Sequence, residues 1–197
     1  MVPLTPTFWK VEYDGGGKVL FNFDGSGDLL IQPQTPNRSD ETFAALVLLK
    51  PSMQFPLKNY VVSIDVTTTR QLRADKPNEW EVFWFFGNYR AKTPHAKEAN
   101  YFLLKPQAGA ELGRAFEQVG QQFLKTDNTK TLILNKRQRF TYVKNGAHFR
   151  VYRGNQLVLD YNEKETASEG LYDHAGALGL YAEDAQVRVH SFSYRAL

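Results

Sequence analysis

The stretch RFTYVKNGAHFRVYR, residues 139–153, alternates apolar and polar side chains on both sides of a turn signal. Asn145-Gly146 suits a two-residue type I′ turn, because both central residues of that turn need positive φ. Closing the chain there predicts an apolar face that pairs Tyr142 with Phe149 and Phe140 with Val151. The other face would carry Arg139, Thr141, Arg150 and Tyr152. One apolar and one polar face is what a β-sandwich requires of a strand pair.

The same period of two recurs along most of the chain, in runs rich in β-branched and aromatic residues. Before residue 106 these runs are 8–13, 18–23, 43–49, 59–69, 79–89 and 100–105. Pro, Gly, Asn or Asp clusters separate most of them, and similar runs continue to the C-terminus. Only residues 109–124 have a helical appearance, and their three glycines argue against a long helix. About a dozen short strands predict an all-β, antiparallel β-sandwich of the jelly-roll type with little helix.

Length and composition favour a single globular domain over residues 1–197. The chain is 42% hydrophobic and 14% aromatic, which argues against disorder. No run approaches the roughly 18 apolar residues of a membrane span. Cysteine is absent, so disulfides and thiolate chemistry are excluded. The N-terminal stretch MVPLTPTFWKVEYD has neither a basic head nor a long apolar run, so it does not resemble a signal peptide. The expected location is extracytoplasmic, with any signal peptide absent from this sequence.

The net charge of +3 is modest, but its distribution is uneven. Residues 128–159 contain no acid and seven bases: Lys130, Lys136, Arg137, Arg139, Lys144, Arg150 and Arg153. This segment is either a footprint for an anionic partner, such as a uronic-acid polymer, or a solvated sheet face kept soluble by cations. No helix-turn-helix, zinc-finger or RNP signature is present, so nucleic acid is an unlikely partner.

The C-terminal part resembles the concanavalin A-like lectin/glucanase superfamily. The segments RFTYVKNGAHFRVYRGNQLVLDY (139–161) and GALGLYAEDAQVRVHSFSYRAL (176–197) are similar to the C-terminal half of its LamG-like and 3-keto-disaccharide hydrolase-like members. These domains end with an NG-type turn, a G-x-(I/L)-G-L-Y strand and a closing strand beside the N-terminus. The middle of the chain is similar to a bacterial branch of the superfamily. The resemblance implies a jelly roll whose concave sheet faces a glycan, while members range from lectins to hydrolases and lyases.

Two active-site patterns of that superfamily are missing. The E-x-D-x-x-E run of laminarinase-type hydrolases is absent, and Glu79-Trp80-Glu81 is the nearest stretch without matching it. The R-T-E-x-R and Q-I-H strands of alginate lyases are absent too. Cleavage by either scheme is therefore doubtful.

Strand parity over residues 79–89 suggests a binding face. One parity, with Trp80, Val82, Trp84 and Phe86, is assigned to the core, and the other, with Glu79, Glu81, Phe83 and Phe85, to the cleft. Glu81, Lys105 and Glu111 would then form a polar row, and Phe83, Phe85 and Tyr101 would stack on sugar rings. Further candidate ligands for sugar hydroxyls and charges are Asn88, Arg90, Gln121 and Gln122. The alternative is a plain Glu81–Lys105 ion pair on a solvated sheet.

The same face offers two kinds of catalytic group. Glu81 and Glu111 would have to flank a glycosidic bond at ~5 Å for retention or ~6.5–9.5 Å for inversion. A lyase would use Tyr101 or Lys105 as base and Arg90 as the cation on a uronate. His95, in the loop before residue 100, is a weaker candidate base, and the four scattered histidines do not have transition-metal spacing.

Calcium is a possible structural ion, and no cofactor is required. FDGSGD (23–28) places Asp24 and Asp28 around glycines, and Asp184 belongs to a second oxygen pair before the closing strand. Superfamily members often hold calcium where the first and last strands meet. The alternative is a tight hairpin turn. The polar segment 162–175 is expected to be an exposed rim or mobile flap.

These patterns predict a carbohydrate-recognition domain that binds a polysaccharide or oligosaccharide on its concave sheet. The first alternative is a glycan-cleaving enzyme, hydrolase or lyase, on the same face. The second is a non-catalytic surface protein whose basic sheet face, around Arg139 and Arg150, meets an anionic partner. The sequence leaves the sugar, the linkage and the oligomeric state open.

Overall fold

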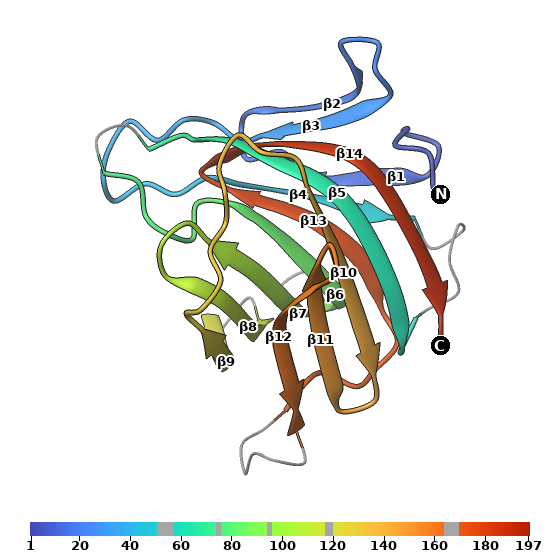
Figure 1. Ribbon diagram of the computed structural model, residues 1–197. Coiled ribbons are helices and arrows are strands. Elements are labelled where there is room, and N and C mark those ends of the chain that lie inside the picture. The colour runs from blue at the N-terminus through green and yellow to red at the C-terminus, as the bar shows by residue number, and fades with distance from the viewer. Residues whose placement is uncertain (51–56, 74–75, 94–95, 117–119, 164–169) are drawn as a thin grey trace.

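Short alternating runs cannot bury their apolar faces alone, so they pair into sheets that pack against each other. The computed structural model describes residues 1–50, 57–73, 76–93, 96–116, 120–163 and 170–197. These residues form two seven-stranded antiparallel sheets packed face to face (Figure 1). The predicted all-β sandwich of the jelly-roll type is confirmed. No helix in the described part of the chain is long and apolar enough to cross a membrane.

Sheet A contains, in spatial order, β1 (Trp9–Tyr13), β4 (Ala44–Leu49), β13 (Ala177–Glu183), β6 (Phe83–Thr93), β7 (Ala96–Lys105), β8 (Gly109–Phe116) and β9 (Gly120–Asp127). Sheet B contains β12 (Gln156–Asn162), β11 (His148–Arg153), β10 (Gln138–Asn145), β5 (Tyr60–Gln71), β14 (Ala185–Ala196), β3 (Asp28–Gln32) and β2 (Lys18–Phe23). The segment with helical appearance, 109–124, is the β8–β9 hairpin. Strand β3 directly follows the turn that the sequence suggested as a calcium loop.

The β10–β11 hairpin keeps its predicted faces but not its predicted register. Tyr142 lies opposite Val151 and not Phe149. Asn145 pairs with His148, so the turn is made by Gly146 and Ala147. Gly146 has φ 58°, and its N–H donates to Asn59 Oδ1 at 2.8 Å. Of the two residues predicted to have positive φ, Gly146 has it and Asn145 does not, and the turn is one residue later than predicted. Each strand partner moves by two residues, which leaves the side-chain faces unchanged because the period of a strand is two.

Strand β6 has the opposite orientation from the one predicted. Phe85 stacks on Tyr142 of sheet B at a centroid distance of 4.3 Å, and Phe83 lines a small internal cavity together with Val66 and Phe140 of sheet B. The two predicted ring-stacking residues therefore belong to the core between the sheets. Trp84 has the other parity and faces outward from sheet A. The prediction was wrong because residues 82–86 are apolar at every position, so alternation alone could not distinguish the two faces.

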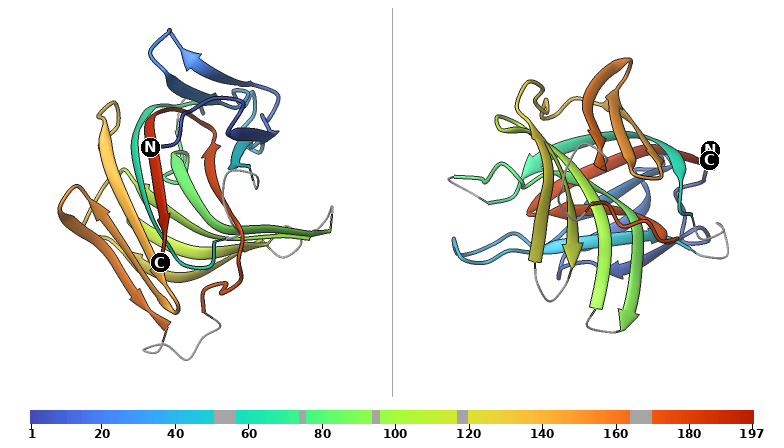
Figure 2. Two further views of the ribbon diagram at one scale, coloured as in Figure 1. Left: turned by 90° about the vertical axis from the view of Figure 1, so that its right-hand side faces the viewer. Right: turned by 90° about the horizontal axis from the view of Figure 1, so that it is seen from below.

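Sheet A is strongly curved. Strands β6 and β7 bend away from sheet B, as the left view of Figure 2 shows. The curl brings Lys97 of β7 to 5.9 Å from the ring of Tyr13 on β1, although β6, β13 and β4 lie between these two strands. The outer face of sheet A is therefore a trough, and its two sides approach each other at Lys97 and Tyr13.

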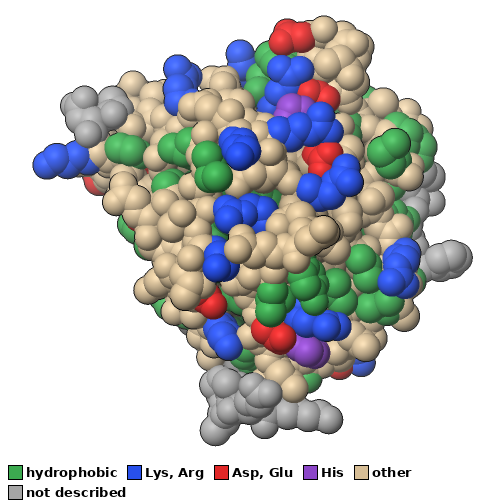
Figure 3. Space-filling model, in the orientation of Figure 1, with side chains coloured by type: hydrophobic (Ala, Val, Ile, Leu, Met, Phe, Trp, Pro, Cys, Tyr) green, Lys and Arg blue, Asp and Glu red, His purple; other side chains and the backbone are tan. Residues whose placement is uncertain are grey.

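The basic segment 128–159 lies partly on the outer face of sheet B, where Lys and Arg side chains are interspersed with acids (Figure 3). Arg137 and Arg139 both bind the Asp65 carboxylate, each at 2.6 Å. Lys144 is fully buried and pairs with Asp173 at 3.0 Å. Three of the seven bases are thus paired with acids, and one of these three is in the interior. This pairing weakens the hypothesis of an anionic partner on this sheet.

Because Phe85 packs between the sheets, truncating it should destabilise the fold. We expect Phe85→Ala to lower the free energy of unfolding by about 3–5 kcal/mol, measured by urea denaturation. Phe123→Ala is the control, since Phe123 is 62% exposed, and should cost under about 1 kcal/mol. Equal losses in the two variants would contradict the assigned orientation of β6.

The Asp65 ion pairs should make stability depend on acid pH. Hydrogen bonding to Arg139, opposed by partial burial, lowers the pKa of Asp65 from 3.8 to about 2. This stabilisation is complete above the unfolded pKa and is lost as pH falls through the folded pKa. We therefore expect the urea midpoint of the parent to fall between pH 3.8 and about pH 2, and that of Asp65→Asn to fall less over the same range. Asp14→Asn, at an exposed turn, should follow the parent, and a parent-like slope in Asp65→Asn would contradict the assignment.

Candidate functional site

Two rows of side chains cross the trough on the outer face of sheet A. The strand registers place the first row as Tyr13, Leu46, Tyr181, Trp84, Leu103 and Glu111. The second row is Lys10, Leu48, Gly179, Phe86, Tyr101, Gly113 and Phe123. Each row takes residues from at least six strands, so only the assembled sheet creates it. The floor of the trough is aromatic, and its ends carry charge.

Trp84 is the centre of the aromatic floor. Its ring lies 5.1 Å from Tyr101 on one side and 5.3 Å from Tyr181 on the other. Phe86 stacks on Tyr181 at 4.8 Å with an interplanar angle of 12°. Such packing fixes the ring planes and adds stability beyond area burial. The floor is therefore rigid rather than a loose collection of side chains.

The two tyrosines of this floor, Tyr101 and Tyr181, each donate a hydrogen bond to a carboxylate. The Tyr101 hydroxyl donates to Glu111 Oε1 at 2.8 Å, and Lys105 Nζ donates to Glu111 Oε2 at 2.8 Å. The Tyr181 hydroxyl donates to Glu183 Oε2 at 2.5 Å. Tyr101, Lys105 and Glu111 were predicted to share a face, and the structure brings them together. Lys105 pairs with Glu111, however, and not with Glu81.

Gly113 makes the Tyr101–Glu111 contact possible. A Cβ atom added at this position would lie 2.4 Å from the Tyr101 hydroxyl oxygen. The missing side chain lets the Tyr101 ring lean over β8 toward the carboxylate. A glycine inside a strand often marks such a close approach.

Burial controls the protonation of these groups. It raises the pKa of Tyr101, and the adjacent Glu111 carboxylate raises it further, so the phenol remains a hydrogen-bond donor. Burial also raises the pKa of Glu183, against the Tyr181 hydrogen bond that lowers it, and the nearby Asp184 and Glu81 carboxylates add to the increase. A tyrosine with a raised pKa is a poor candidate for a general base.

A cavity of about 470 Å3 opens in the trough, which we call the trough cavity. This volume is within the range of small-ligand sites. Its walls combine flat rings with groups that can form hydrogen bonds, and they include Tyr13, Trp84, Phe86, Lys97, Glu98 and Gln121. Of the candidate ligands predicted from sequence, Gln121 is the one that lines this cavity.

Glu81 is not in the trough. It is fully buried, and its Oε1 accepts a hydrogen bond from Arg73 Nε at 2.6 Å. The same guanidinium binds Asp184 at 2.7 Å and the carbonyl of Glu41 at 2.7 Å. Burial raises the pKa of Glu81 despite this cation. The predicted pair of Glu81 and Glu111 is therefore not assembled on one face, because Glu81 precedes β6 and is bound to Arg73.

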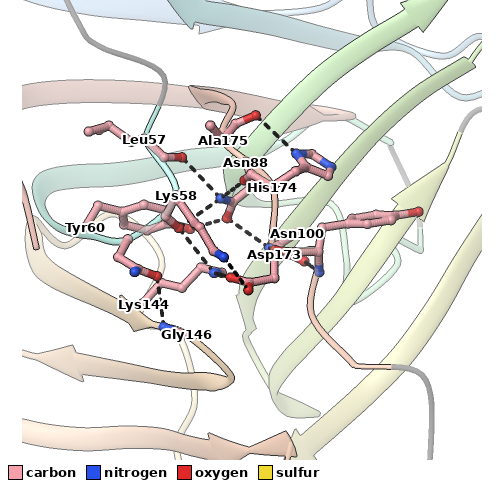
Figure 4. A network of polar contacts seen from close by, with 12 residues as sticks. Leu57, Lys58, Tyr60, Asn88, Asn100, Lys144, Gly146, Asp173, His174 and Ala175 are labelled. Atoms are coloured by element: carbon pink, nitrogen blue, oxygen red, sulfur yellow. Dashed lines mark hydrogen bonds and ion pairs between the residues drawn. The ribbon is translucent and has the colours of Figure 1, made fainter.

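Asn88 is a structural residue and not a free sugar ligand (Figure 4). It is fully buried with φ 55°, and its Nδ2 donates to the carbonyls of Leu57, Lys58 and His174. Its Oδ1 accepts from Tyr60 and from Asn100. All polar atoms of the Asn88 side chain are thus used in hydrogen bonds that join β6 to residues 57–60, to β7 and to His174.

The segment predicted to be an exposed flap is anchored where it is described. Asn100 exchanges hydrogen bonds with the Tyr172 backbone at 2.8 and 2.9 Å, and Asp173 pairs with buried Lys144 (Figure 4). Residues 164–169 of that segment lie outside the described residues. So does His95, the loop residue considered as a base.

The remaining predicted ligands have other contacts. Glu79 Oε2 accepts the backbone N–H of Gln107 at 2.7 Å, and Gln122 Oε1 accepts from the Arg114 guanidinium. Arg90 lies 3.5 Å from Glu98 and lines a second cavity, described below. These three residues are therefore outside the trough cavity.

The suggested calcium ligands lie apart. Asp28 binds Arg188 at 2.5 Å and His190 at 2.8 Å, whereas Asp184 binds Arg73 and the Phe43 N–H. Asp24 lies in the β2–β3 turn with φ 54°. The described residues contain no group of three acidic or histidine side chains suited to a metal ion. A structural calcium remains a prediction without support from this arrangement. His190, which contacts Asp28, is mostly covered.

Sequence reasoning missed Tyr13, Trp84, Tyr181 and Glu183. The signal for the last two was present in GLYAE, residues 179–183, where an aromatic and an acid alternate on one face of a strand. Tyr13 had no such signal, because only the curvature of sheet A brings β1 over the trough.

No protein-family model and no curated protein matches the sequence. Among solved structures, a CBM66 carbohydrate-binding module from Bacillus subtilis superposes with a TM-score of 0.63 at 14% identity, over 95% of each chain. A glycoside hydrolase family 16 endo-glucanase from Bacteroides ovatus gives 0.62 at 10% identity, over 97% of this chain and 96% of that chain. An alginate lyase of polysaccharide lyase family 7 gives 0.52 at 14%, over 96% and 94%. The chain therefore has the concanavalin A-like jelly-roll fold, as the resemblance predicted.

The hydrogen bond from Tyr181 should control the titration of Glu183. Because this bond favours the charged carboxylate, we expect Tyr181→Phe to raise the pKa of Glu183 further above its usual 4.5. Carboxyl ¹³C NMR titration would measure the change. Tyr101→Phe is the matched control, since the Tyr101 hydroxyl donates to Glu111 and not to Glu183. An unchanged Glu183 titration in Tyr181→Phe, or an equal change in the control, would contradict the assignment.

Proposed function

We propose that this protein recognises a carbohydrate, which it binds in the trough on the outer face of sheet A. The observation that carries the proposal is a cavity of about 470 Å3 whose lining combines the rings of Tyr13, Phe86 and Tyr181 with the polar side chains of Lys97, Glu98 and Gln121. Sugar rings present C–H groups that pack on aromatic faces, and hydroxyls that need hydrogen-bond partners. Rings and polar groups in one concave site meet both requirements.

The polar groups suit neutral hydroxyls. Glu98, Gln121 and Lys97 offer a mixture of donors and acceptors on the cavity wall. The site is also largely preformed, since packing holds its rings, and preformed sites lose less entropy on binding.

Recognition is favoured over cleavage by the arrangement of the acids. Glu81 is bound to Arg73 away from the trough. Glu111 and Glu183 stand on β8 and β13, which are separated by β7 and β6. Each of these two carboxylates is already hydrogen-bonded to a tyrosine hydroxyl, Glu111 to Tyr101 and Glu183 to Tyr181.

The structural neighbours support a carbohydrate ligand but do not choose between its uses. They include a carbohydrate-binding module, an endo-glucanase and an alginate lyase, all at 14% identity or less. The proposal includes the extracytoplasmic location expected from the sequence, where polysaccharides are encountered.

Tyr13 provides the test with the least risk to folding, because it lies at the rim and is 37% exposed. In affinity electrophoresis against a polysaccharide panel, we expect Tyr13→Ala to weaken retention by about tenfold, since a stacking ring is lost. Val11→Ala is the matched control on the same strand. Val11 is 36% exposed but pairs with Val47 on the opposite parity, so its truncation should leave retention unchanged.

Two outcomes would contradict the proposal. Absence of retention by every polysaccharide would exclude carbohydrate binding by this trough. Release of new reducing ends or of unsaturated uronides during incubation would instead identify a glycan-cleaving enzyme.

A further inference from the structure

A second cavity opens on the outer face of sheet A, at the β1–β4 side of the trough. Its volume is about 440 Å3, and we call it the basic cavity. Tyr89 lines both cavities, so they adjoin at this ring. Leu48 and Ala177 form an apolar floor, while Lys10, Lys50 and Arg90 stand on its rim.

Cations outnumber acids around this cavity. Its lining has three cationic side chains and one carboxylate, Glu12, which pairs with Lys10 at 2.6 Å. Arg90 lies at the longer distance of 3.5 Å from Glu98, with 43% of its side chain exposed. Lys50 Nζ donates to the carbonyl of Pro6 at 2.5 Å, and the described residues give it no acidic partner. Lys50 and Arg90 therefore leave positive charge at the cavity mouth.

The wall beside Tyr89 is held in place from within. Gly176 approaches β6 so closely that a Cβ atom there would lie 2.4 Å from the Asn88 carbonyl carbon. Its N–H donates to Leu57 O at 3.1 Å, and Asn88 Nδ2 binds His174 O at 2.7 Å. The same buried asparagine that fixes β6 thus also fixes Ala175 and Gly176 in the lining.

We propose that the basic cavity binds an anionic sugar unit, carrying a uronate carboxylate or a sulfate ester, of the same glycan that occupies the trough cavity. The inference rests on the proposed function. Two adjoining cavities that share Tyr89 fit successive units of one chain. The apolar floor accepts the C–H face of a ring, and the cations on the rim attract the charged substituent.

The test compares each acidic ligand with its own neutral form. Calorimetric titration would use uronic-acid oligosaccharides beside their carboxyl-reduced forms, and sulfated oligosaccharides beside their desulfated forms. We expect one of the two acidic classes to bind about tenfold tighter than its neutral form at low salt, and the class that does so identifies the substituent. Added salt should reduce the preference.

Charge removal at the rim should abolish that preference. In the double variant Lys50→Gln/Arg90→Gln, the ratio of the neutral to the acidic dissociation constant should fall toward one. Lys18→Gln, an exposed lysine on β2 of sheet B, is the matched control and should keep the parent ratio.

The outcomes separate the two proposals. If neutral forms bind and lose affinity in Tyr13→Ala, but neither acidic class binds more tightly, the anionic subsite is wrong and the trough proposal stands. A preference that survives in the double variant would also overturn the subsite. If neither acidic nor neutral forms bind, both proposals fail.

Discussion

The stack of Phe85 on Tyr142 between the sheets fixes which side of β6 faces outward. Once Phe85 points inward, strand alternation requires Trp84 and Phe86 to point out, where Tyr101 and Tyr181 pack against them. Every feature of the trough depends on this orientation, including its aromatic floor and its two tyrosine–carboxylate pairs. The core and the candidate site are thus the two faces of one strand.

Asn88 links the rest of the trough to that strand. Asn88 has φ 55° and interrupts the regular hydrogen bonding of β6 to its neighbours. Its buried side-chain amide instead donates hydrogen bonds to the carbonyls of Leu57 and His174. An unsatisfied buried amide would be costly, so these bonds strongly favour one arrangement. That arrangement places Tyr89 between the trough cavity and the basic cavity, and it holds the wall at Gly176.

The charged residues differ in the partners that the fold gives them. Arg73 forms ion pairs with Glu81 and Asp184, and Asp65 forms ion pairs with Arg137 and Arg139. Glu111 and Glu183 differ because each accepts a hydrogen bond from a tyrosine hydroxyl of the trough floor, and Glu111 is also bound by Lys105. Charge counted along the sequence pointed to sheet B, whereas the less compensated cations on Lys50 and Arg90 lie beside the trough.

The all-β class, the position of most strands and the two faces of the β10–β11 hairpin could be predicted from the sequence, because alternation and turn residues are local signals. The sequence also brought Tyr101, Lys105 and Glu111 together, since neighbouring strands with a short turn share a face. The orientation of β6 depends on packing between the two sheets, because residues 82–86 are all apolar and satisfy either parity. The same holds for Tyr13 and Glu183, because the curvature of a sheet and its strand order depend on packing between distant segments.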